Sequence, residues 1–455
     1  MSPTANGLWE RASAESISAF TLHRLLDTIT RAYEQVPFYR RLYTASGLDP
    51  ARLRTMSDVR RHVPFVTKAD LLAFQDGQEL AGLERPEIRQ FHLTSGTTGT
   101  GREIHVRSVR DIAALGTGGA YAYLWAGLRP GQRLLLTIPY AQTLAGPYFQ
   151  ASCRAAGLVP VNGFALDTEA RLVALRSYGC AGLSATPSHL HRLTAVARRN
   201  GLQPATDLPA LSTIILSGEA YSLQWAHGMQ KFWGAQIHEG WGATQTLGVA
   251  LATCLLGAVV ERQGSMSRGS LHALDHRVLV EVLNGEEEVG PGHRGEMVIS
   301  TLRSFGMPCI RFRMGDEIRR GDRTKCACGM ELSRYEAGTL RRIDDMMKIR
   351  GMNIWPQAVD GAVLEVAGVT DYRGSVYTDG DGREQVMLEV EATGGSSSPV
   401  LEDTVRRRVK AAIGVTPLVR IVPRGAIAEP AVDGDGPFKA RRWRVQRAVA
   451  QERHS

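Results

Sequence analysis

Four short β-like runs alternate with four helical patterns between residues 132 and 234, and this alternation restricts the fold more than any other feature of the sequence. The β-like runs are QRLLLTIPY, LVPVN, AGLSATP and LSTIILSG, and the helical segments that follow them are FQASCRAAG, TEARLVALRSYG, HLHRLTAVARRNG and SLQWAHGMQKFWG. Repeated strand–helix units place consecutive strands side by side and parallel, with helices covering the sheet. The sequence therefore predicts an α/β fold with a parallel sheet.

The segments on either side of this region have different patterns. Residues 1 to about 75 are predicted to be helical, with a turn at Pro64 and a helix cap at Thr67. From about 270 the runs HRVLVEVL and GEMVIST read as strands, and a smaller pattern of strands and helices follows Asp344. A chain of 455 residues exceeds one compact core. We predict a large N-terminal α/β domain, 1–343, and a small, mobile C-terminal α+β domain, 344–455.

The composition is that of a soluble globular protein, because 43% of the residues are hydrophobic and 22% are charged. No run approaches the about 18 apolar residues of a membrane span, and the N-terminus lacks a basic stretch followed by an apolar one. We therefore expect a cytoplasmic protein that does not bind membranes. The six cysteines of so long a chain do not suggest a secreted disulfide framework.

The net charge is +8, but the arginines are scattered along the chain. Solvated helix faces account for this charge, and attraction of a polyanionic small molecule is the alternative. No helix–turn–helix, zinc-finger array or aromatic RNA-binding pattern accompanies the positive charge. Nucleic acid is therefore excluded as the expected partner.

The run HLTSGTTGTGREIHV, residues 92–106, holds three Gly, four Thr and one Ser after the β-like segment EIRQFHL. It has almost no apolar side chain to bury, but it offers backbone N–H groups and hydroxyls, which hold phosphate. Arg102 and Glu103 stand where a Walker A loop needs Lys and Ser or Thr, so the run is not a Walker A loop. The alternative is a flexible Gly/Thr turn without a ligand.

The run resembles the phosphate loop of the adenylate-forming enzymes, the superfamily of acyl-CoA ligases, peptide-synthetase adenylation domains and luciferases. The resemblance spans nearly the whole chain and is sharpest to the phenylacetate-CoA ligase-like branch. The motifs in the family's order are TSGTTG, SGEAYS (217–222), EGWGATQ (239–245), IRFRMGDEI (310–318), RRIDDMMKIRGMNIWP (341–356) and the Lys439 segment GPFKARR. Six motifs in order are far more specific than one.

The resemblance implies that ATP activates a carboxylic acid, and the branch implies an aromatic one. A carboxylate is a poor electrophile, and its attack on the α-phosphate gives an acyl-adenylate with a good leaving group, together with pyrophosphate. The acyl group then passes to the thiol of CoA. The expected partners are therefore a small carboxylic acid and CoA, the expected cofactors are ATP and Mg²⁺, and a homodimer is left open.

Two other readings remain at this point. In the first, the adenylate is transferred to the phosphopantetheine arm of an acyl-carrier protein or to an amine. In the second, the chain is a non-catalytic nucleotide-binding homologue. Gln245 motivates the second reading, because the family usually has at this position a Glu that helps to hold Mg²⁺. An amide brings no negative charge, so either the phosphates hold most of the Mg²⁺ or the chemistry has drifted.

The resemblance assigns the ATP contacts residue by residue. Trp241, where the family usually has Tyr, is expected to lie against the adenine, and Asp316 is expected to accept hydrogen bonds from both ribose hydroxyls. Gly218 and Glu219 are expected on the other side of the base. The remaining expected ATP contacts are Thr94, Ser95, Gly96, Thr97, Thr98 and Gly99 at the β- and γ-phosphates, and Gly242, Thr244 and Gln245 in the motif that holds Trp241.

Three residues have implied catalytic roles. Lys439 is expected to contact the carboxylate and the α-phosphate, where its ammonium offsets developing charge. Arg342 is expected to assist at the ribose, and Asp344 falls at the hinge about which the small domain rotates between adenylation and thioester formation. Arg102 is a candidate for the cation that Lys or Thr supplies in relatives.

The acid and thiol sites are also implied by the resemblance. Tyr140, Tyr148, Phe149 and Ser217 are candidates for the wall of the acid pocket, although each aromatic is individually more typical of a core residue. The thiol arm is expected to pass Gly351, whose missing side chain leaves room for it.

Cys326 and Cys328 form a Cys-x-Cys pair that looks like half of a metal knuckle. Some members of this branch carry a zinc site here, and Cys254 and His272 fall where those members place the other two ligands. A set of three Cys and one His is typical of a closed, structural Zn²⁺ site. His276 is a spare ligand candidate, and a core thiol with two free loop thiols is the alternative.

Overall fold

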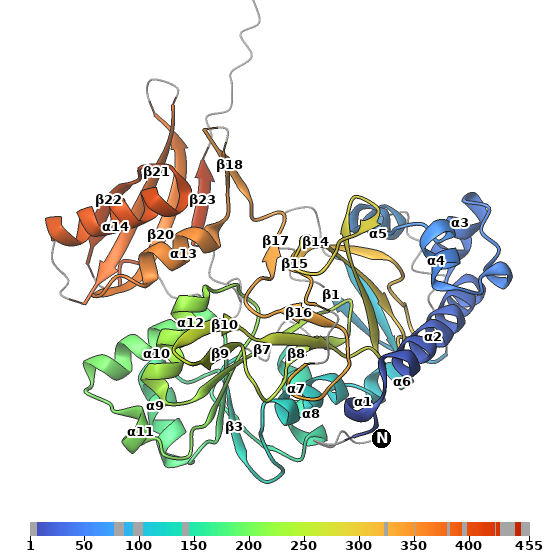
Figure 1. Ribbon diagram of the computed structural model, residues 1–455, viewed down its shortest axis with the longest axis horizontal. Coiled ribbons are helices and arrows are strands. Elements are labelled where there is room, and N and C mark those ends of the chain that lie inside the picture. The colour runs from blue at the N-terminus through green and yellow to red at the C-terminus, as the bar shows by residue number, and fades with distance from the viewer. Residues whose placement is uncertain are drawn as a thin grey trace, which may run out of the picture.

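The computed structural model describes residues 7–76, 86–93, 103–138, 145–322, 326–350, 352–379, 383–393, 398–423, 425–427 and 442–446. Figure 1 shows a large part, coloured blue to yellow with the orange strands β16 and β17, and a small orange to red part that lies against α10 and α12. The predicted fold class is confirmed by this mixed α/β arrangement. Within these ranges, no helix is long and apolar enough to cross a membrane.

The predicted strand–helix alternation forms the centre of the large part. Five strands run parallel in the order β4-β3-β5-β6-β7. Their bounds are β3 Arg133–Leu136, β4 Val159–Asn162, β5 Gly182–Ala185, β6 Thr213–Leu216 and β7 Gln236–Ala243. The connecting helices are α8 Ala145–Ala155, α9 Thr168–Ser177, α10 Pro187–Arg199, α11 Pro204–Asp207 and α12 Leu223–Trp233.

Antiparallel strands extend this sheet beyond β7 and form a second sheet. β8 Gly248–Thr253, β11 Ser270–Ala273 and β16 Arg334–Glu336 continue the first sheet. The second sheet has the order β13-β12-β14-β15-β17. Its strands are β12 Val278–Asn284, β13 Glu287–Glu288, β14 Arg294–Thr301, β15 Phe312–Arg319 and β17 Arg341–Arg342, and β9 Val259–Arg262 pairs separately with β10 Ser265–Arg268.

The N-terminal segment is helical, as predicted. Its elements are α1 Leu8–Arg11, α2 Ala14–Gln35, α3 Pro37–Ala45, the 3-10 turn Pro50–Arg52, α4 Met56–His62 and α5 Lys68–Asp76. The cap at Thr67 is confirmed, because its hydroxyl accepts the backbone N–H of Asp70 at 3.2 Å. Tyr39 anchors this segment to the connection between β14 and β15 of the second sheet, since its hydroxyl donates to the Pro308 carbonyl at 2.9 Å.

The Gly/Thr run lies between two antiparallel strands, β1 Ile88–Leu93 and β2 Ile104–Ser108. The predicted strand before the run is therefore confirmed, and residues 94–102 themselves lie outside the described ranges. The helices α6 Val109–Ala113 and α7 Thr117–Trp125 follow β2.

The small part has its own hydrophobic core, which includes residues from Met347 to Val419. Its sheet has the order β22-β21-β20-β23, and the hairpin β18–β19 precedes it. The elements are β18 Met347–Ile349, β19 Met352–Ile354, α13 Pro356–Leu364, β20 Val369–Thr378, β21 Glu384–Ala392, α14 Pro399–Ile413, β22 Leu418–Val422 and β23 Trp443–Gln446. A boundary at 343/344 stays a prediction.

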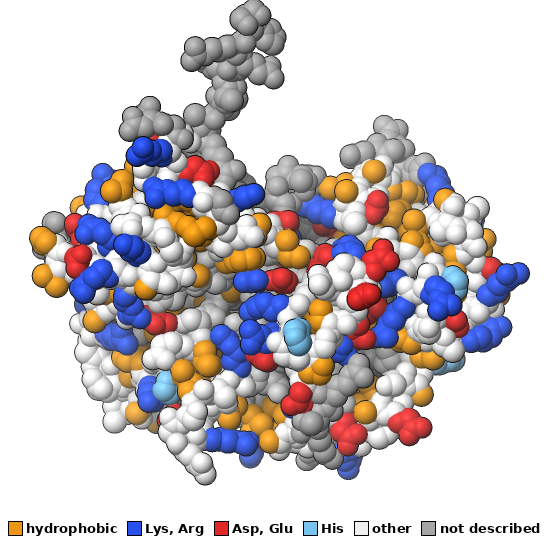
Figure 2. Space-filling view, turned by 45° about the horizontal axis from the view of Figure 1, so that its top comes forward, with side chains coloured by type: hydrophobic (Ala, Val, Ile, Leu, Met, Phe, Trp, Pro, Cys, Tyr) orange, Lys and Arg blue, Asp and Glu red, His pale blue; other side chains and the backbone are white. Residues whose placement is uncertain are grey.

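Polar contacts join the two parts. Arg192 on α10 pairs with Asp371 on β20 at 2.8 Å, and the Ser222 hydroxyl donates to Glu365 at 2.6 Å. Within the small part, Arg442 also pairs with Asp371, at 3.2 Å. The first two contacts hold the small part against α10 and the start of α12, which follow β5 and β6 in the chain. On the face shown in Figure 2, Lys and Arg are interspersed with Asp and Glu, in keeping with the scattered charge of the sequence.

Candidate active site and metal centre

A cavity of about 1510 Å³ lies between the two parts. Its walls come from the ends of β6 and β7, from β15 and β17, and from α13 and β23 of the small part. A drug-sized ligand typically occupies about 300–1,000 Å³. This cavity therefore has room for a nucleotide together with a second molecule.

Two of the predicted ATP-binding motifs meet at one edge of the sheet. Ser217, Gly218 and Glu219 directly follow β6. The segment from Trp241 to Gln245 comprises the end of β7 and the two residues after it. The predicted contact residues of both segments line the cavity. β6 and β7 are parallel neighbours, so their carboxyl ends lie together, where open α/β sheets bind ligands.

Contacts with neighbouring residues fix the backbone at Gly242 and the side chain of Glu219 at this edge. A Cβ at Gly242 would lie 2.3 Å from the Gly248 carbonyl oxygen, so glycine is needed there. The Glu219 carboxylate accepts the backbone N–H of Ser188 at 2.9 Å and so is held at the start of α10. The wall that we expect beside the base is therefore rigid.

Asp316, Arg342 and Asp344 also line the cavity and contact one another. Asp316 on β15 is 5% exposed, and its register partner on β17 is Arg342, whose guanidinium lies 3.5 Å from the carboxylate. The same guanidinium donates to Asp344 at 3.0 Å and to the Met314 carbonyl at 3.0 Å. Arg342 thus joins the expected ribose acceptor to the expected hinge residue.

The acid-pocket candidates Tyr148 and Phe149 lie on α8 and line the cavity. Tyr148 is 2% exposed, and its hydroxyl accepts the Val249 N–H at 2.7 Å. Its ring lies against Gly248, where an added Cβ would come within 1.9 Å of a ring carbon. Tyr148 is therefore a fixed wall of the cavity, and Tyr140 lies outside the described residues.

Several predicted site residues fall on parts of the chain that the structure does not describe. They are Thr94, Ser95, Gly96, Thr97, Thr98, Gly99, Arg102, Tyr140, Gly351 and Lys439. Their assignments stay predictions from the sequence.

Among the carboxylates of the cavity wall to which the sequence patterns gave no role are Glu239 and Glu103. Glu239, inside the motif EGWGATQ, accepts the Gly338 N–H at 2.6 Å, and burial raises the pKa of Glu239. Glu103 accepts a hydrogen bond from the Gln245 amide at 2.6 Å. The sequence pointed to these two carboxylates only through their positions inside or beside one of the six motifs.

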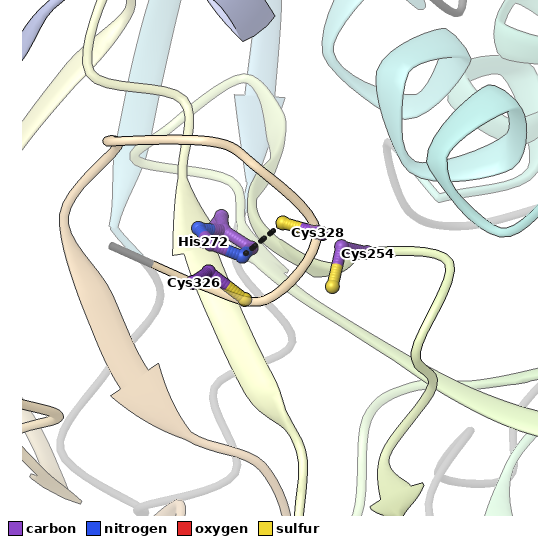
Figure 3. A group of neighbouring side chains, drawn as sticks. All are labelled: Cys254, His272, Cys326 and Cys328. Atoms are coloured by element: carbon purple, nitrogen blue, oxygen red, sulfur yellow. Dashed lines mark hydrogen bonds between the residues drawn. The ribbon is translucent and has the colours of Figure 1, made fainter. Parts of the chain in front are cut away.

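The four predicted metal ligands lie together, as Figure 3 shows. Their ligand atoms all lie within 4.8 Å of one another, and the Cys328 sulfur is 3.5 Å from Nε2 of His272. Tetrahedral zinc with Zn–S near 2.3 Å places ligand atoms about 3.8 Å apart, so the set fits this ion with small shifts. His276 is not part of the group, because its ring stacks on Trp9 with centroids 4.8 Å apart.

Comparison with known proteins agrees with this arrangement. Phenylacetate-coenzyme A ligase of Thermus thermophilus is 27% identical over 438 residues, which are 91% of this chain and 94% of that protein. A crystal structure of 2-hydroxyisobutyryl-CoA ligase in the postadenylation state with 2-HIB-AMP has a TM-score of 0.83 at 23% identity, covering 97% of this chain and 93% of that one. The thioesterification state of the same ligase, with 2-HIB-AMP and CoA, has a TM-score of 0.67 at 23% identity, covering 98% and 94%.

Two family models match the chain, one in the large part and one in the small part. The model for AMP-binding enzymes matches residues 48–305, which is over half of the chain, and the model for the AMP-binding enzyme C-terminal domain matches residues 351–433. The resemblance inferred from six motifs is thereby confirmed: the chain belongs to the family of AMP-binding enzymes.

Proposed function

We propose that this protein is an AMP-forming acid–CoA ligase that activates an aromatic carboxylic acid. The observation that carries the proposal is the cavity between the two parts, in which the ends of β6 and β7 face Asp316, Arg342 and Asp344. Relatives named phenylacetate-coenzyme A ligase match nearly the full length of the chain and support the same activity.

In the proposed first step, the cavity holds ATP and the acid together. Trp241 lies against the adenine, Asp316 accepts the ribose hydroxyls, and the phosphates extend toward residues 94–99. The acid carboxylate attacks the α-phosphate, its oxygen forms the new P–O bond, and the bond to the bridging oxygen breaks, so that pyrophosphate leaves. Lys439 offsets the charge on the transferring oxygens. Bound Mg²⁺ would neutralise charge on the phosphates.

In the proposed second step, the CoA thiol attacks the acyl carbonyl, AMP leaves and a thioester forms. The small part rotates about Asp344 between the steps, and the thiol arm passes Gly351. The greater similarity to the postadenylation arrangement than to the thioesterification arrangement supports assigning this conformer to the first step. A carrier-protein acceptor, a homodimer and the cytoplasmic location stay predictions.

The acid site is proposed to accept a flat, apolar ring. Ile138, Tyr148, Phe149 and Val249 line the cavity beside Trp241, and Tyr148 and Phe149 meet edge to face with centroids 5.6 Å apart. Aromatic rings pack well in such edge-to-face surroundings. The names of the sequence relatives support the same class of acid.

The test is pyrophosphate release from ATP with a panel of aromatic and short aliphatic acids, each with and without CoA. We expect release with an arylacetic or aryl acid, and an acyl-CoA product when CoA is added. Release that CoA leaves unchanged, without an acyl-CoA product, would favour a carrier protein or an amine as acceptor. ATP binding without turnover of any acid would favour a non-catalytic homologue.

Asp316→Asn is expected to raise the KM for ATP by about 10- to 100-fold. The substitution keeps the side-chain shape but removes the charge and one acceptor, and a hydrogen bond to a charged group contributes about 1.5–3 kcal/mol. Steady-state pyrophosphate release measures the effect. The matched control is Asp322→Asn, at an exposed carboxylate paired with Arg334. An unchanged KM for ATP in Asp316→Asn would refute the ribose assignment.

We also propose that Cys254, His272, Cys326 and Cys328 hold a structural Zn²⁺. The sulfur and nitrogen donors are the ligands that zinc prefers, and Cys254, His272 and Cys326 are buried. With four protein ligands, the site would have no open position for substrate. The ion would join β8, β11 and the loop before β16.

A further inference from the structure

Three buried polar side chains lie in a row on β2 and on the residue that precedes it. Glu103, His105 and Arg107 alternate along the chain, so they point to the same side of the strand. Their exposed fractions are 4%, 0% and 0%. Buried charge is costly unless it is paired or serves as a ligand, so this face needs a physical explanation.

The first member of the row, Glu103, lines the active-site cavity. Its carboxylate accepts hydrogen bonds from Nε2 of Gln245 at 2.6 Å and from Nε2 of His105 at 2.9 Å. Burial raises the pKa of Glu103, but the bond from His105 and the other attractions outweigh it, and the net pKa lies below the ordinary value. Burial lowers the pKa of His105, and the contact with Glu103 opposes this effect.

Several groups of the described residues act on the Glu103 carboxylate. Lys68 on α5, which also lines the cavity, attracts the carboxylate electrostatically. Gln245 and His105 orient the carboxylate through their hydrogen bonds. The carboxylate is therefore held in a fixed orientation at the cavity wall, and a carboxylate oxygen is a ligand that Mg²⁺ accepts.

The last member of the row, Arg107, fixes the neighbouring loop. Its guanidinium donates to the Thr244 carbonyl and, at 3.4 Å, to the Ser304 hydroxyl. The strand thus positions Glu103 directly and positions Gln245 through the carbonyl of the preceding residue. Glu103 also follows the predicted phosphate-binding run 94–99 by only four residues. A cation beside Glu103 would be close along the chain to the groups that hold the phosphates.

We propose that Glu103 supplies the protein carboxylate for the Mg²⁺ that accompanies ATP, and that Gln245 orients it. Mg²⁺ in nucleotide sites is commonly bound through one or two carboxylates together with the phosphates. Gln245 cannot supply the charge, because its amide is neutral. The negative charge that position 245 lacks is thus provided by Glu103, the residue before β2. This inference rests on the proposed use of ATP.

The test compares metal-bound and metal-free nucleotide binding in Glu103→Gln. The probe is Mn²⁺ with a non-hydrolysable ATP analogue, and free Mn²⁺ is measured by electron paramagnetic resonance. We expect the Kd for Mn²⁺ in the ternary complex to rise by at least about 10-fold. In EDTA, the same variant should bind the analogue as tightly as the wild type or more tightly, because a carboxylate repels phosphate.

A purely structural role of Glu103 gives a different pattern. If Glu103 only positions the loop at Gln245, then Glu103→Gln weakens metal-free and metal-bound binding in parallel, and this result overturns the proposal. Unchanged Mn²⁺ affinity in Glu103→Gln also overturns it. The matched control is Glu296→Gln, which removes a carboxylate of β14 from the same cavity wall and should leave Mn²⁺ affinity unchanged.

Gln245→Glu keeps Glu103 and provides a second measurement if Glu103→Gln does not fold. Two adjacent carboxylates repel each other without a cation, so Mg²⁺ with the analogue should raise the Tm of Gln245→Glu more than that of the wild type. An equal rise in both proteins would contradict the proposal. A wild type that binds the analogue neither with nor without metal would instead refute the proposed function itself.

Discussion

Replacing Lys439 with alanine is expected to reduce acid-dependent pyrophosphate release by at least about 100-fold while the protein stays folded. An ammonium placed where charge develops in a water-poor site contributes more to the transition state than to the ground state, and removal of one such donor costs about 10²–10³ in rate. Because Lys439 lies outside the described residues, the assignment rests on its place in the motif GPFKARR.

The two proposed steps allow this prediction to be tested specifically. Single-turnover assays would follow pyrophosphate release from ATP and the acid, and separately thioester formation from a synthetic acyl-adenylate and CoA. We expect Lys439→Ala to lose the first and to retain the second. Lys410→Ala, in the last turn of α14 of the same small part, is the matched control. Adenylation by Lys439→Ala at the wild-type rate would show that another group stabilises the transferring oxygens.

Replacing Cys326 and Cys328 together with serine is expected to remove about one equivalent of zinc and to lower the Tm by at least about 10 °C. Structural zinc contributes directly to folding, since its ligands come together only in the folded chain. For a domain of this size, about 1 kcal/mol corresponds to a Tm change of roughly 2–4 °C, so a loss of several kcal/mol gives the expected change.

Metal analysis of purified protein together with thermal unfolding measures both effects. Cys180→Ala is the control, because Cys180 is a buried thiol of the core outside the group of four and its loss should leave the zinc content unchanged. A wild-type protein that is free of metal and as stable as the double variant would refute the proposed zinc site. A metal-containing double variant would place the ion elsewhere.

The sequence predicted those parts of the fold that depend on local patterns of residues. The alternation between residues 132 and 234 predicted β3 to α12 because apolar periodicity reflects which face of each element is buried. The helix cap at Thr67 was predictable for the same kind of reason, since the side chain and the amide that it caps are three residues apart. The Gly/Thr run was placed correctly after a strand.

The sequence predicted only part of the candidate site. The motifs that contain Gly218, Trp241 and Asp316 were found by resemblance, and β6 and β7 bring two of them to one edge of the sheet. The Cys-x-Cys pair predicted two of the four zinc ligands from the local sequence. Cys254 and His272 are far from this pair in sequence, and only the resemblance predicted them as ligands. Their convergence depends on the antiparallel pairing of β8, β11 and β16.

By itself, the sequence determined the order of the elements, the fold class, the family and the positions of its motifs, because each of these depends on spacing along the chain. The tertiary structure alone decided that Glu103 meets Gln245, 142 residues away, and that Arg192 on α10 meets Asp371 on β20. A hydrogen bond between distant residues depends on strand register and on how two bodies pack. Neither is encoded in the local pattern around either residue.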